Sequence, residues 1–239
     1  MTFLVGTRGS KLSLAQTNWV ISELKKENEG SEFEIKTITT KGDTDSRALF
    51  IIDQKGIFEK EIDKAVAEKE IDFAVHSLKD IPSDIAESLT IACIPIRESA
   101  NDVIITKDGS NLKTIQSGAV IGTSSLRRAV QVSRIRQDVV VKPVRGNIET
   151  RVNKVTDGKF DAVILAEAGI SRLGLDVKHS VLSTKDFPPS PGQGALAIVC
   201  RADDEKTISM LKKIEDEKSR NEIEAERALS EYVESGCRF

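Results

Sequence analysis

The sequence is short of cysteine and of long apolar runs, and each shortage excludes a class of protein. Three cysteines among 239 residues are too few for a disulfide framework and fit a reducing compartment. No apolar run approaches the roughly 20 residues needed to cross a bilayer. The opening MTFLVGTRGS has no basic leader, long apolar core or small-residue cleavage site, so no signal peptide is expected. We therefore expect a cytoplasmic protein.

The sequence also lacks an excess of basic residues and has little histidine. Its formal net charge is -3 and its pI is about 5.6. This balance gives no reason to expect binding to nucleic acid, which needs a basic stripe or patch. His76 and His179 are the only histidines, and a metal site is not expected. We predict no nucleic-acid partner, no membrane partner and no bound metal ion.

The pattern of apolar residues predicts an α/β fold. Hydrophobic residues make up 39% of the chain and charged residues 31%, which is enough apolar material for a packed core. Short apolar runs alternate with amphipathic stretches, a pattern typical of buried, largely parallel sheets covered by helices. The predicted strands are residues 33–39, 72–77, 90–96, 102–106, 119–123, 139–144, 161–166 and 195–200, and the predicted helices are residues 57–69, 125–137, 147–157, 204–216 and 219–235.

A short internal similarity predicts two related lobes. Residues 5–7 (VGT) and 121–123 (IGT) each close an apolar run and lead into a helical pattern. Residues 71–75 (IDFAV) likewise resemble residues 160–164 (FDAVI). We infer two similar α/β lobes with a first boundary near residues 96–100. The alternative is chance, because short strand–turn–helix strings recur in any α/β protein.

Six arginines lie beside predicted strand ends or helix starts rather than on polar helix faces. The residues between 123 and 128 (TSSLRR) place hydroxyls, backbone N–H groups and two guanidinium groups at one helix N-terminus, which attracts anions. Ligands of open α/β sheets bind at the carboxyl ends of strands, and Arg recognises carboxylates and phosphates. We therefore predict a polyanion cleft, although any one of these residues alone is better explained by solvation or ion pairing. The six are Arg8, Arg127, Arg128, Arg145, Arg151 and Arg172.

Other polar residues occupy similar positions. Asp80 follows a predicted strand beside Lys79, where a carboxylate can exchange protons or stabilise positive charge; alone, it is more simply a turn residue. Lys55 is either a cationic loop over the cleft or a helix entry. Gln193 lies in a turn of residues 190–194 that we interpret as a crossing between the lobes, with a plain turn as the alternative.

The three cysteines differ in their surroundings. Cys93 and Cys200 lie inside apolar strands and are expected to be buried, inert thiols. Cys237 follows a Gly and precedes Arg238, outside the predicted helices and strands. Exposure and a nearby cation favour the thiolate and hence reactivity, although from the residues alone an ordinary terminal thiol with no role is the slightly better explanation.

Ten short motifs, taken together and in order, resemble the porphobilinogen deaminase (hydroxymethylbilane synthase) family. They cover nearly the whole chain from residue 6 to residue 237. The motifs are GTRGSKLSLAQ, TTKGD, KGIFEKEI, DFAVHSLKDIPS, VIGTSSLRRAVQ, VRGNIETRV, DAVILAEAGISRLG, PSPGQGALAI, EAERAL and SGC.

The resemblance implies a fold, an activity and a cofactor. The family has two periplasmic-binding-protein-like lobes with a cleft between them, and a small third domain. The expected lobes are residues 1–98, completed by residues 195–216, and residues 99–194. The enzyme is a transferase of tetrapyrrole (heme, porphyrin) biosynthesis. It deaminates porphobilinogen and joins four units head to tail on a dipyrromethane primer linked to a cysteine, and water then releases the product. A monomer is expected.

The resemblance also assigns roles to individual residues. Cys237 matches the cysteine that carries the dipyrromethane through a thioether, and Asp80 matches the catalytic aspartate. Each pyrrole carries an acetate and a propionate, so the growing chain needs several cations around it. The matching cofactor-binding residues are Cys237, Lys79, Asp80, Thr123, Ser124, Ser125, Arg127, Arg128, Arg145 and Gly146. The matching substrate-binding residues are Arg8, Ser10, Lys55, Arg145, Arg151, Arg172 and Gln193.

The sequence departs from the family pattern in two places. Family members usually continue well beyond the cofactor cysteine, whereas the sequence here ends at Phe239. Residues 217–239 are therefore expected to be a helical remnant of the third domain that carries Cys237. Residues 50–54 (FIIDQ) replace a stretch where the family often has Gly and Lys. The alternative function is a catalytically impaired two-lobed module that binds anions or tetrapyrroles.

Overall fold

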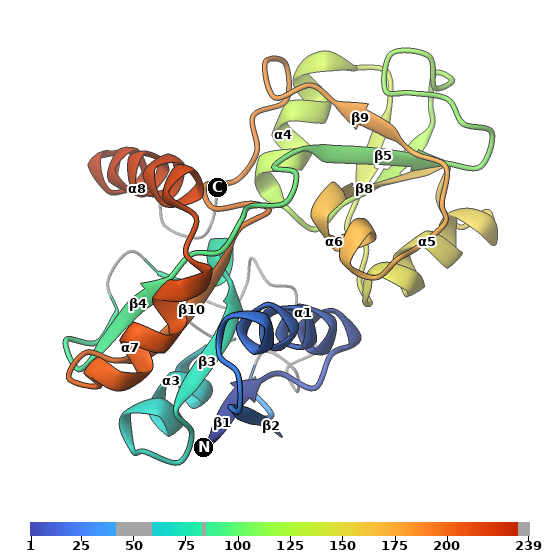
Figure 1. The fold of residues 1–239 in the computed structure, drawn as a ribbon. Helices are drawn as coiled ribbons and strands as arrows, with labels where there is room; N and C mark the ends of the chain where they lie inside the picture. The colour runs from blue at the N-terminus through green and yellow to red at the C-terminus, as the bar shows by residue number, and fades with distance from the viewer. Residues whose placement is uncertain (42–58, 83–84, 234–239) are drawn as a thin grey trace. The chain divides into compact units, whose positions relative to one another are not determined.

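The computed structural model describes residues 1–41, 59–82 and 85–233. Tertiary contacts divide these residues into two compact units. Unit 1 contains residues 1–41, 59–82, 85–98 and 195–233, and unit 2 contains residues 99–194. Each unit is an α/β structure built on one five-stranded sheet (Figure 1).

The sheet of unit 1 has the strand order β2-β1-β3-β10-β4. Successive side chains of β3 and β10 pack into two different apolar clusters, one with α1 and α7 and the other with α3. Both faces of these strands are therefore buried, which is why their sequences are continuous apolar runs. The strands are β1 (Thr2–Thr7), β2 (Glu32–Thr37), β3 (Phe73–Ser77), β4 (Leu89–Cys93) and β10 (Leu196–Arg201), and the helices are α1 (Lys11–Glu27), α3 (Lys60–Ala67), η2 (Leu78–Asp80), α7 (Glu205–Leu211), η3 (Lys212–Ile214) and α8 (Glu217–Tyr232).

The sheet of unit 2 has the order β7-β6-β8-β5-β9. Val132 of α4 contributes to the apolar cluster that includes Ile104 and Ile164, and Val155 of α5 contributes to the cluster that includes Val103 and Leu165. The strands are β5 (Asp102–Thr106), β6 (Val120–Gly122), β7 (Val140–Lys142), β8 (Ala162–Ala166) and β9 (Ser180–Leu182), and the helices are α4 (Leu126–Ile135), α5 (Ile148–Thr156) and α6 (Glu167–Arg172).

The predicted strands and helices are present with small shifts at their ends, but the sheets are not largely parallel. In unit 1, β1 pairs in parallel with β2 and β3, whereas β10 is antiparallel to β3 and β4. In unit 2, β6 pairs in parallel with β7 and β8, whereas β5 is antiparallel to β8 and β9. The expectation was wrong because β5 and β10 follow segments that cross from one unit to the other, so they enter their sheets from the opposite end.

The two units repeat one arrangement, down to single hydrogen bonds. Val5 and Gly6 of β1 pair with Phe73 and Ala74, and Ile121 and Gly122 of β6 pair with Ala162 and Val163. In unit 1, Asp72 accepts a hydrogen bond of 2.8 Å from the backbone N–H of Leu4. In unit 2, Asp161 accepts one of 2.7 Å from that of Val120. These contacts explain the internal sequence similarity as shared packing.

Gly6 of β1 and Gly122 of β6 allow a bulky side chain to lie directly on the strand next to the central one of each sheet. A Cβ atom added to Gly6 would lie 2.2 Å from Ile71 Cδ1, and one added to Gly122 would lie 2.9 Å from a ring carbon of Phe160. Ile71 and Phe160 hold equivalent places in the repeated motif. In each unit, therefore, a Gly on the strand leaves room for the bulky side chain that packs against it, Ile71 in unit 1 and Phe160 in unit 2.

We expect Gly6→Ala to lower the free energy of unfolding by about 1–3 kcal/mol, because the side chains of Ile71 and Ile62 must shift within a packed core. Gly9→Ala is the matched control, since a Cβ there meets nothing within 4 Å. Urea unfolding of both variants measures the difference. Equal stability of the two proteins would contradict the close packing of Ile71 on β1.

Helix α8 packs on unit 1. Ile223 is fully buried in the same apolar cluster as Ile62 of α3. Arg97 donates hydrogen bonds of 2.7 and 3.0 Å to the two carboxylate oxygens of Glu226, and Ser219 accepts a hydrogen bond of 2.8 Å from the backbone N–H of Arg97. The assignment of residues 217–239 to a third-domain remnant stays a prediction. Within the described ranges, no helix is long and apolar enough to span a bilayer.

Candidate active site

The turn between β6 and α4 is fixed by its own hydroxyl groups. Ser125 is the N-cap of α4 and accepts from the backbone N–H of Arg128 at 3.4 Å. Thr123 is buried, and its Oγ1 accepts from the backbone N–H of Ser125 at 3.2 Å. Ser124 Oγ donates to the carbonyl of Val144 at 2.7 Å. These bonds hold the start of α4 at the carboxyl end of β6 and satisfy backbone N–H groups of Ser125 and Arg128.

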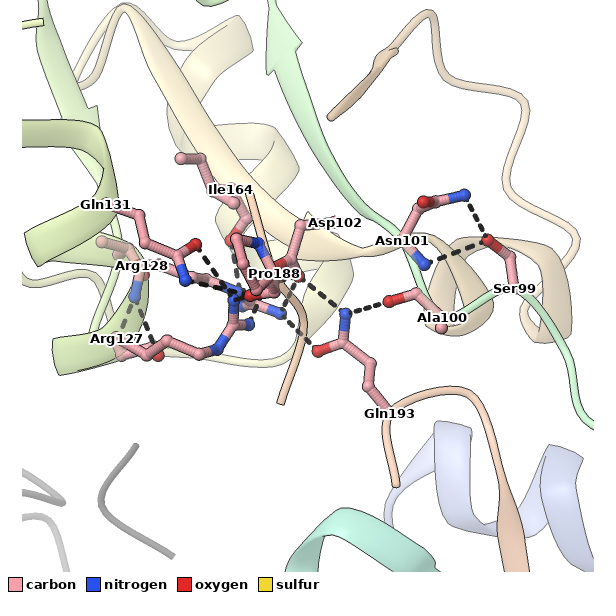
Figure 2. Close-up of polar contacts among 12 residues, drawn as sticks. Ser99, Ala100, Asn101, Asp102, Arg127, Arg128, Gln131, Ile164, Pro188 and Gln193 are labelled. Carbon is pink, nitrogen blue, oxygen red and sulfur yellow. Dashed lines mark hydrogen bonds and ion pairs between the residues drawn. The ribbon is translucent and has the colours of Figure 1, made fainter. Parts of the chain in front are cut away.

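Arg127 and Arg128, from the first turn of α4, both reach the carboxylate of Asp102 (Figure 2). Arg128 donates from Nε at 3.0 Å and from Nη2 at 2.6 Å to Asp102 Oδ1. Arg127 donates from Nη2 at 2.7 Å to Asp102 Oδ2, and from Nη1 at 2.6 Å to the carbonyl of Pro188. The cluster of Asp102, Arg127 and Arg128, called here the charged trio, therefore carries one net positive charge.

Asp102 is fully buried, yet it stays ionised. Burial opposes its ionisation, but the charges and hydrogen bonds of Arg128 and Arg127 outweigh burial and hold the pKa of Asp102 below its usual range. A lowered folded-state pKa means that the ionised group stabilises the fold above the unfolded-state pKa of about 4. That stabilisation is lost as the pH falls through the folded-state pKa.

A second pair of arginines lies at the next strand end. Arg151 donates from Nε to the carbonyl of Gly146 at 2.8 Å. Burial lowers the pKa of Arg151, and repulsion from Arg128 and Arg145 lowers it further. The guanidinium group of Arg151 is therefore repelled by those of Arg128 and Arg145, and a bound anion would offset this repulsion.

Gly146 makes the turn at this strand end possible. Its φ of +113° is a conformation that residues with side chains rarely adopt, and an added Cβ would lie 2.5 Å from Thr150 Cγ2. Asn147, the next residue, caps α5 by accepting from the backbone N–H of Thr150 at 2.8 Å. The helix therefore starts directly after the turn and carries Arg151 on its first turn.

Gln193 and Arg172 hold the segment that leads out of unit 2. Gln193 is buried, and its Nε2 donates to the carbonyl of Ala100 at 2.7 Å and to Asp102 Oδ1 at 3.0 Å. Its Oε1 accepts from Arg128 Nη2 at 3.3 Å. Arg172 donates to the carbonyl of Gly194 at 2.7 Å. Gln193 thus joins the charged trio to the two crossing segments of the chain, as Figure 2 shows.

In unit 1, the candidate residues lie at the carboxyl ends of β1 and β3. Arg8 follows β1, and Ser10 caps α1 by accepting from the backbone N–H of Ser13 at 3.2 Å. Lys79 and Asp80 form the turn η2 directly after β3. The buried side chains of Leu78 and Ile81 flank this turn.

Two further contacts fix the turn η2. The N–H of Leu78 donates to the carbonyl of Ala195 at 3.1 Å, and the N–H of Ile81 donates to the carbonyl of Leu78 at 3.0 Å. Asp80 is therefore carried on an anchored turn while its own side chain is half-buried. His76, a buried residue of β3, has its Nε2 atom 3.1 Å from Oδ1 of Asp63.

The other residues considered from the sequence are either buried or outside the residues that the structure describes. Lys55, residues 50–54 and Cys237 lie outside the described residues. Cys93 and Cys200 are fully buried, as predicted. Burial raises the pKa of Cys93 far above its usual range, and it raises the pKa of Cys200 to about 12. Both thiols are therefore protonated at neutral pH and poor nucleophiles.

Sequence reasoning missed Asp102, the residue on which the two arginines of α4 converge. Asp102 is the first residue of β5, whereas the predicted site residues follow strands or begin helices. Because β5 is antiparallel to β8, Asp102 lies opposite Ala166, the last residue of β8. An Asp directly before the strongly apolar run VIIT was the signal that could have identified it.

Comparisons with known proteins decide the family. Residues 3–209 match the family profile described as porphobilinogen deaminase, dipyrromethane cofactor-binding domain. The chain is 71% identical over 239 residues to a protein of Nitrosopumilus maritimus named probable porphobilinogen deaminase, and it covers 77% of that protein. The chain belongs to the porphobilinogen deaminase family. The family's enzymes from Brevibacillus brevis and Bacillus subtilis are 45% and 46% identical over 238 and 239 residues, with 98% and 99% of this chain and 76% of each relative covered.

Solved structures agree with the fold class expected of a porphobilinogen deaminase. The methionine-binding protein MetQ matches with a TM-score of 0.54 at 13% identity, over 95% of both chains. The OxyR2 regulatory domain of Vibrio vulnificus matches with a TM-score of 0.51 at 9% identity, over 90% of this chain and 95% of that one. At these identities the likeness concerns the fold alone. The predicted two-lobed, periplasmic-binding-protein-like α/β class is confirmed.

The residues of unit 2 fit the dipyrromethane of the porphobilinogen deaminases. The acetate and propionate carboxylates of the dipyrromethane need cationic donors that are already desolvated and aligned. Arg127, Arg128 and Arg151 supply such donors, because burial lowers the pKa of Arg127 and of Arg151, and hydrogen bonds to Asp102 orient Arg128. Arg127 Nε is buried, and no acceptor in the described part of the chain lies within hydrogen-bond distance of it.

Proposed function

We propose that this chain carries out the reaction of its family. It deaminates porphobilinogen, joins four units head to tail on a dipyrromethane primer attached to Cys237, and releases the linear tetrapyrrole with water. The observation that carries this proposal is the set of arginines gathered at the carboxyl edge of the unit 2 sheet, around the N-terminus of α4. When bound, the dipyrromethane would supply the free pyrrole position for the first incoming unit, and each later unit would be joined to the end of the growing chain.

The arginines of unit 2 bind and orient the carboxylates. A guanidinium group aligns with a carboxylate through two parallel N–H donors, and this geometry is stronger and more directional than a point charge. Arg128 and Arg127 already have their planes set by Asp102. The turn of Thr123, Ser124 and Ser125 places the N-terminus of α4, the positive end of the helix dipole, beside them. Arg145, Gly146 and Arg151 extend the same edge to further carboxylates.

Asp80 is the residue proposed to act on the reacting atoms. Its carboxylate can donate or accept the proton that accompanies loss of ammonia, and it can stabilise the positive charge that develops on the pyrrole. Lys79, Arg8, Ser10, Lys55, Arg172 and Gln193 complete the proposed set of residues that hold the cofactor and the substrate.

Cys237 is the proposed attachment point because the two other cysteines are unsuited to it. Cys93 and Cys200 lie in the cores of β4 and β10 with pKa values raised by burial. A thiol must be ionised and accessible to form the thioether. Our proposal further includes a cytoplasmic, monomeric enzyme that needs neither nucleic acid nor a membrane.

Ammonia release separates this function from that of a non-catalytic binding module. We expect the purified protein, incubated with porphobilinogen, to release one ammonia for each pyrrole incorporated and to form hydroxymethylbilane. A rise in melting temperature with porphobilinogen but no ammonia would instead identify a binding module. That result would refute the proposed enzyme activity.

A further inference from the structure

The two units place different residues at one equivalent position of their antiparallel strands. Gly6 of β1 pairs with Ala74 of β3, and the equivalent Gly122 of β6 pairs with Val163 of β8. Three residues further along, Ser77 at the end of β3 therefore corresponds to Ala166 at the end of β8. Asp102 of β5 lies opposite Ala166, and Leu196 of β10 lies opposite Ser77. The buried Asp102 of unit 2 therefore corresponds to the buried Leu196 of unit 1.

The helix N-termini differ in the same way. The caps align the two helices, since Ser10 accepts from the N–H of Ser13 and Ser125 accepts from the N–H of Arg128. Arg128 therefore corresponds to Ser13, and Arg127 corresponds to the residue before it, Leu12. All three members of the charged trio have uncharged counterparts in unit 1.

This comparison shows that the shared fold does not require the charged trio. Unit 1 forms the same strand order and the same helix start with Leu12, Ser13 and Leu196. Burying a carboxylate and two guanidinium groups carries a large desolvation penalty, and apolar residues often replace such clusters at no loss of stability. A costly cluster that the fold can do without points to a role in binding or chemistry.

The geometry of the trio indicates which role. Both oxygens of Asp102 accept from guanidinium groups, and Gln193 holds Oδ1 from a third direction at 3.0 Å. Arg127 is further held by the carbonyl of Pro188 and lies with its guanidinium carbon 6.0 Å from the centre of the Phe187 ring. Both arginines therefore have one fixed orientation before a ligand arrives, which lowers the entropy lost on binding.

We propose that Asp102 is a positioning residue for the reaction. It fixes the planes of Arg127 and Arg128 and leaves one net positive charge at the N-terminus of α4, so that this end of unit 2 binds the carboxylates of the pyrrole chain in one alignment. Asp102 itself is too deeply buried to touch the substrate and acts through the two arginines. The inference rests on the proposed function of the chain.

The substitution Asp102→Asn tests this role. An amide has one acceptor oxygen and one donor NH₂ group, so in either orientation one arginine faces a donor and loses its alignment. Alignment acts on the bound substrate before and during the reaction. We therefore expect the KM for porphobilinogen to rise and kcat/KM to fall roughly 100-fold, with slower formation of the covalent primer measured by intact mass.

Asp161→Asn is the matched control. It makes the same chemical change directly before β8, at the end of the strands opposite to Asp102, where Asp161 accepts from the backbone N–H of Val120. Partial unfolding lowers the apparent kcat and leaves KM unchanged, so the two effects are separable. An unchanged KM in Asp102→Asn, or an equal rise in both variants, would overturn the proposal.

A triple variant keeps the test informative if Asp102→Asn is unstable. The changes Asp102→Leu, Arg127→Leu and Arg128→Ser give unit 2 the residues that unit 1 has at these places. We expect a higher melting temperature than in the single variant Asp102→Leu, which leaves two buried arginines without their carboxylate, together with loss of primer formation. A triple variant with wild-type KM and primer formation would contradict the inference. If wild-type protein released no ammonia, the proposed function would fail first, independently of Asp102.

Discussion

Replacing Asp80 with Asn is expected to slow formation of hydroxymethylbilane by about 10²- to 10⁴-fold, the range typical of losing a general acid or base. Asn has the shape of Asp but neither the charge nor a proton to exchange. The turn η2 is fixed by the buried Leu78 and Ile81 and by backbone hydrogen bonds, none of which uses the Asp80 carboxylate. We therefore expect the melting temperature and the mass of the covalent primer to match those of wild type.

Asp72→Asn provides the control for this experiment. Asp72 lies at the other end of β3, directly before its first residue, and accepts from the backbone N–H of Leu4. The substitution removes the same charge from the same strand and is expected to leave turnover per folded molecule unchanged. Single-turnover measurement of ammonia release compares the two variants. Wild-type turnover in Asp80→Asn would remove Asp80 from the mechanism.

Cys237→Ser is expected to abolish covalent attachment of pyrroles, because a serine hydroxyl is not ionised at neutral pH and is a far weaker nucleophile than a thiolate. Without a primer, the enzyme has nothing on which to build the chain. We expect the intact mass of this variant to equal that of the bare polypeptide after incubation with porphobilinogen. Product formation should fall below detection.

Cys200→Ala is the comparison for Cys237→Ser. Cys200 is fully buried, and burial raises its pKa to about 12, so its removal should leave primer formation intact in the folded protein. Pyrroles that remain covalently bound in Cys237→Ser would instead place the attachment at Cys93 or Cys200. Mapping the modified peptide identifies which one.

Local patterns predicted most of the secondary structure. The buried runs at β3 and β10 are recognisable because both faces of these strands are covered, so their residues are apolar throughout. The repeated VGT and IGT strings identified equivalent strands in the two units, since Gly6 and Gly122 accommodate side chains at equivalent positions, Ile71 and Phe160. The strand β9 and the six-residue helix α6 were not predicted. The strand β1 and the helix α1 were indicated only by the VGT string, without bounds.

The direction of β5 and β10 was beyond a local reading of the sequence. A strand's apolar run is the same whichever end enters the sheet, so only the path of the crossing segments reveals that these two strands are antiparallel. For the same reason, the arginines of α4 were identified from their helix start, whereas their partner Asp102 was not. Charged residues that follow parallel strands predict a charged site at the carboxyl ends of those strands. They do not predict Asp102, which begins an antiparallel strand at the same end of the sheet.

The intact mass of the protein after stepwise addition of porphobilinogen tests the central claim most directly. The account predicts a holoprotein heavier than the bare polypeptide by two pyrrole units, followed by discrete species that carry up to four more, all absent in Cys237→Ser. A single species at the mass of the bare polypeptide, with no ammonia released at any ratio of substrate to protein, would contradict it.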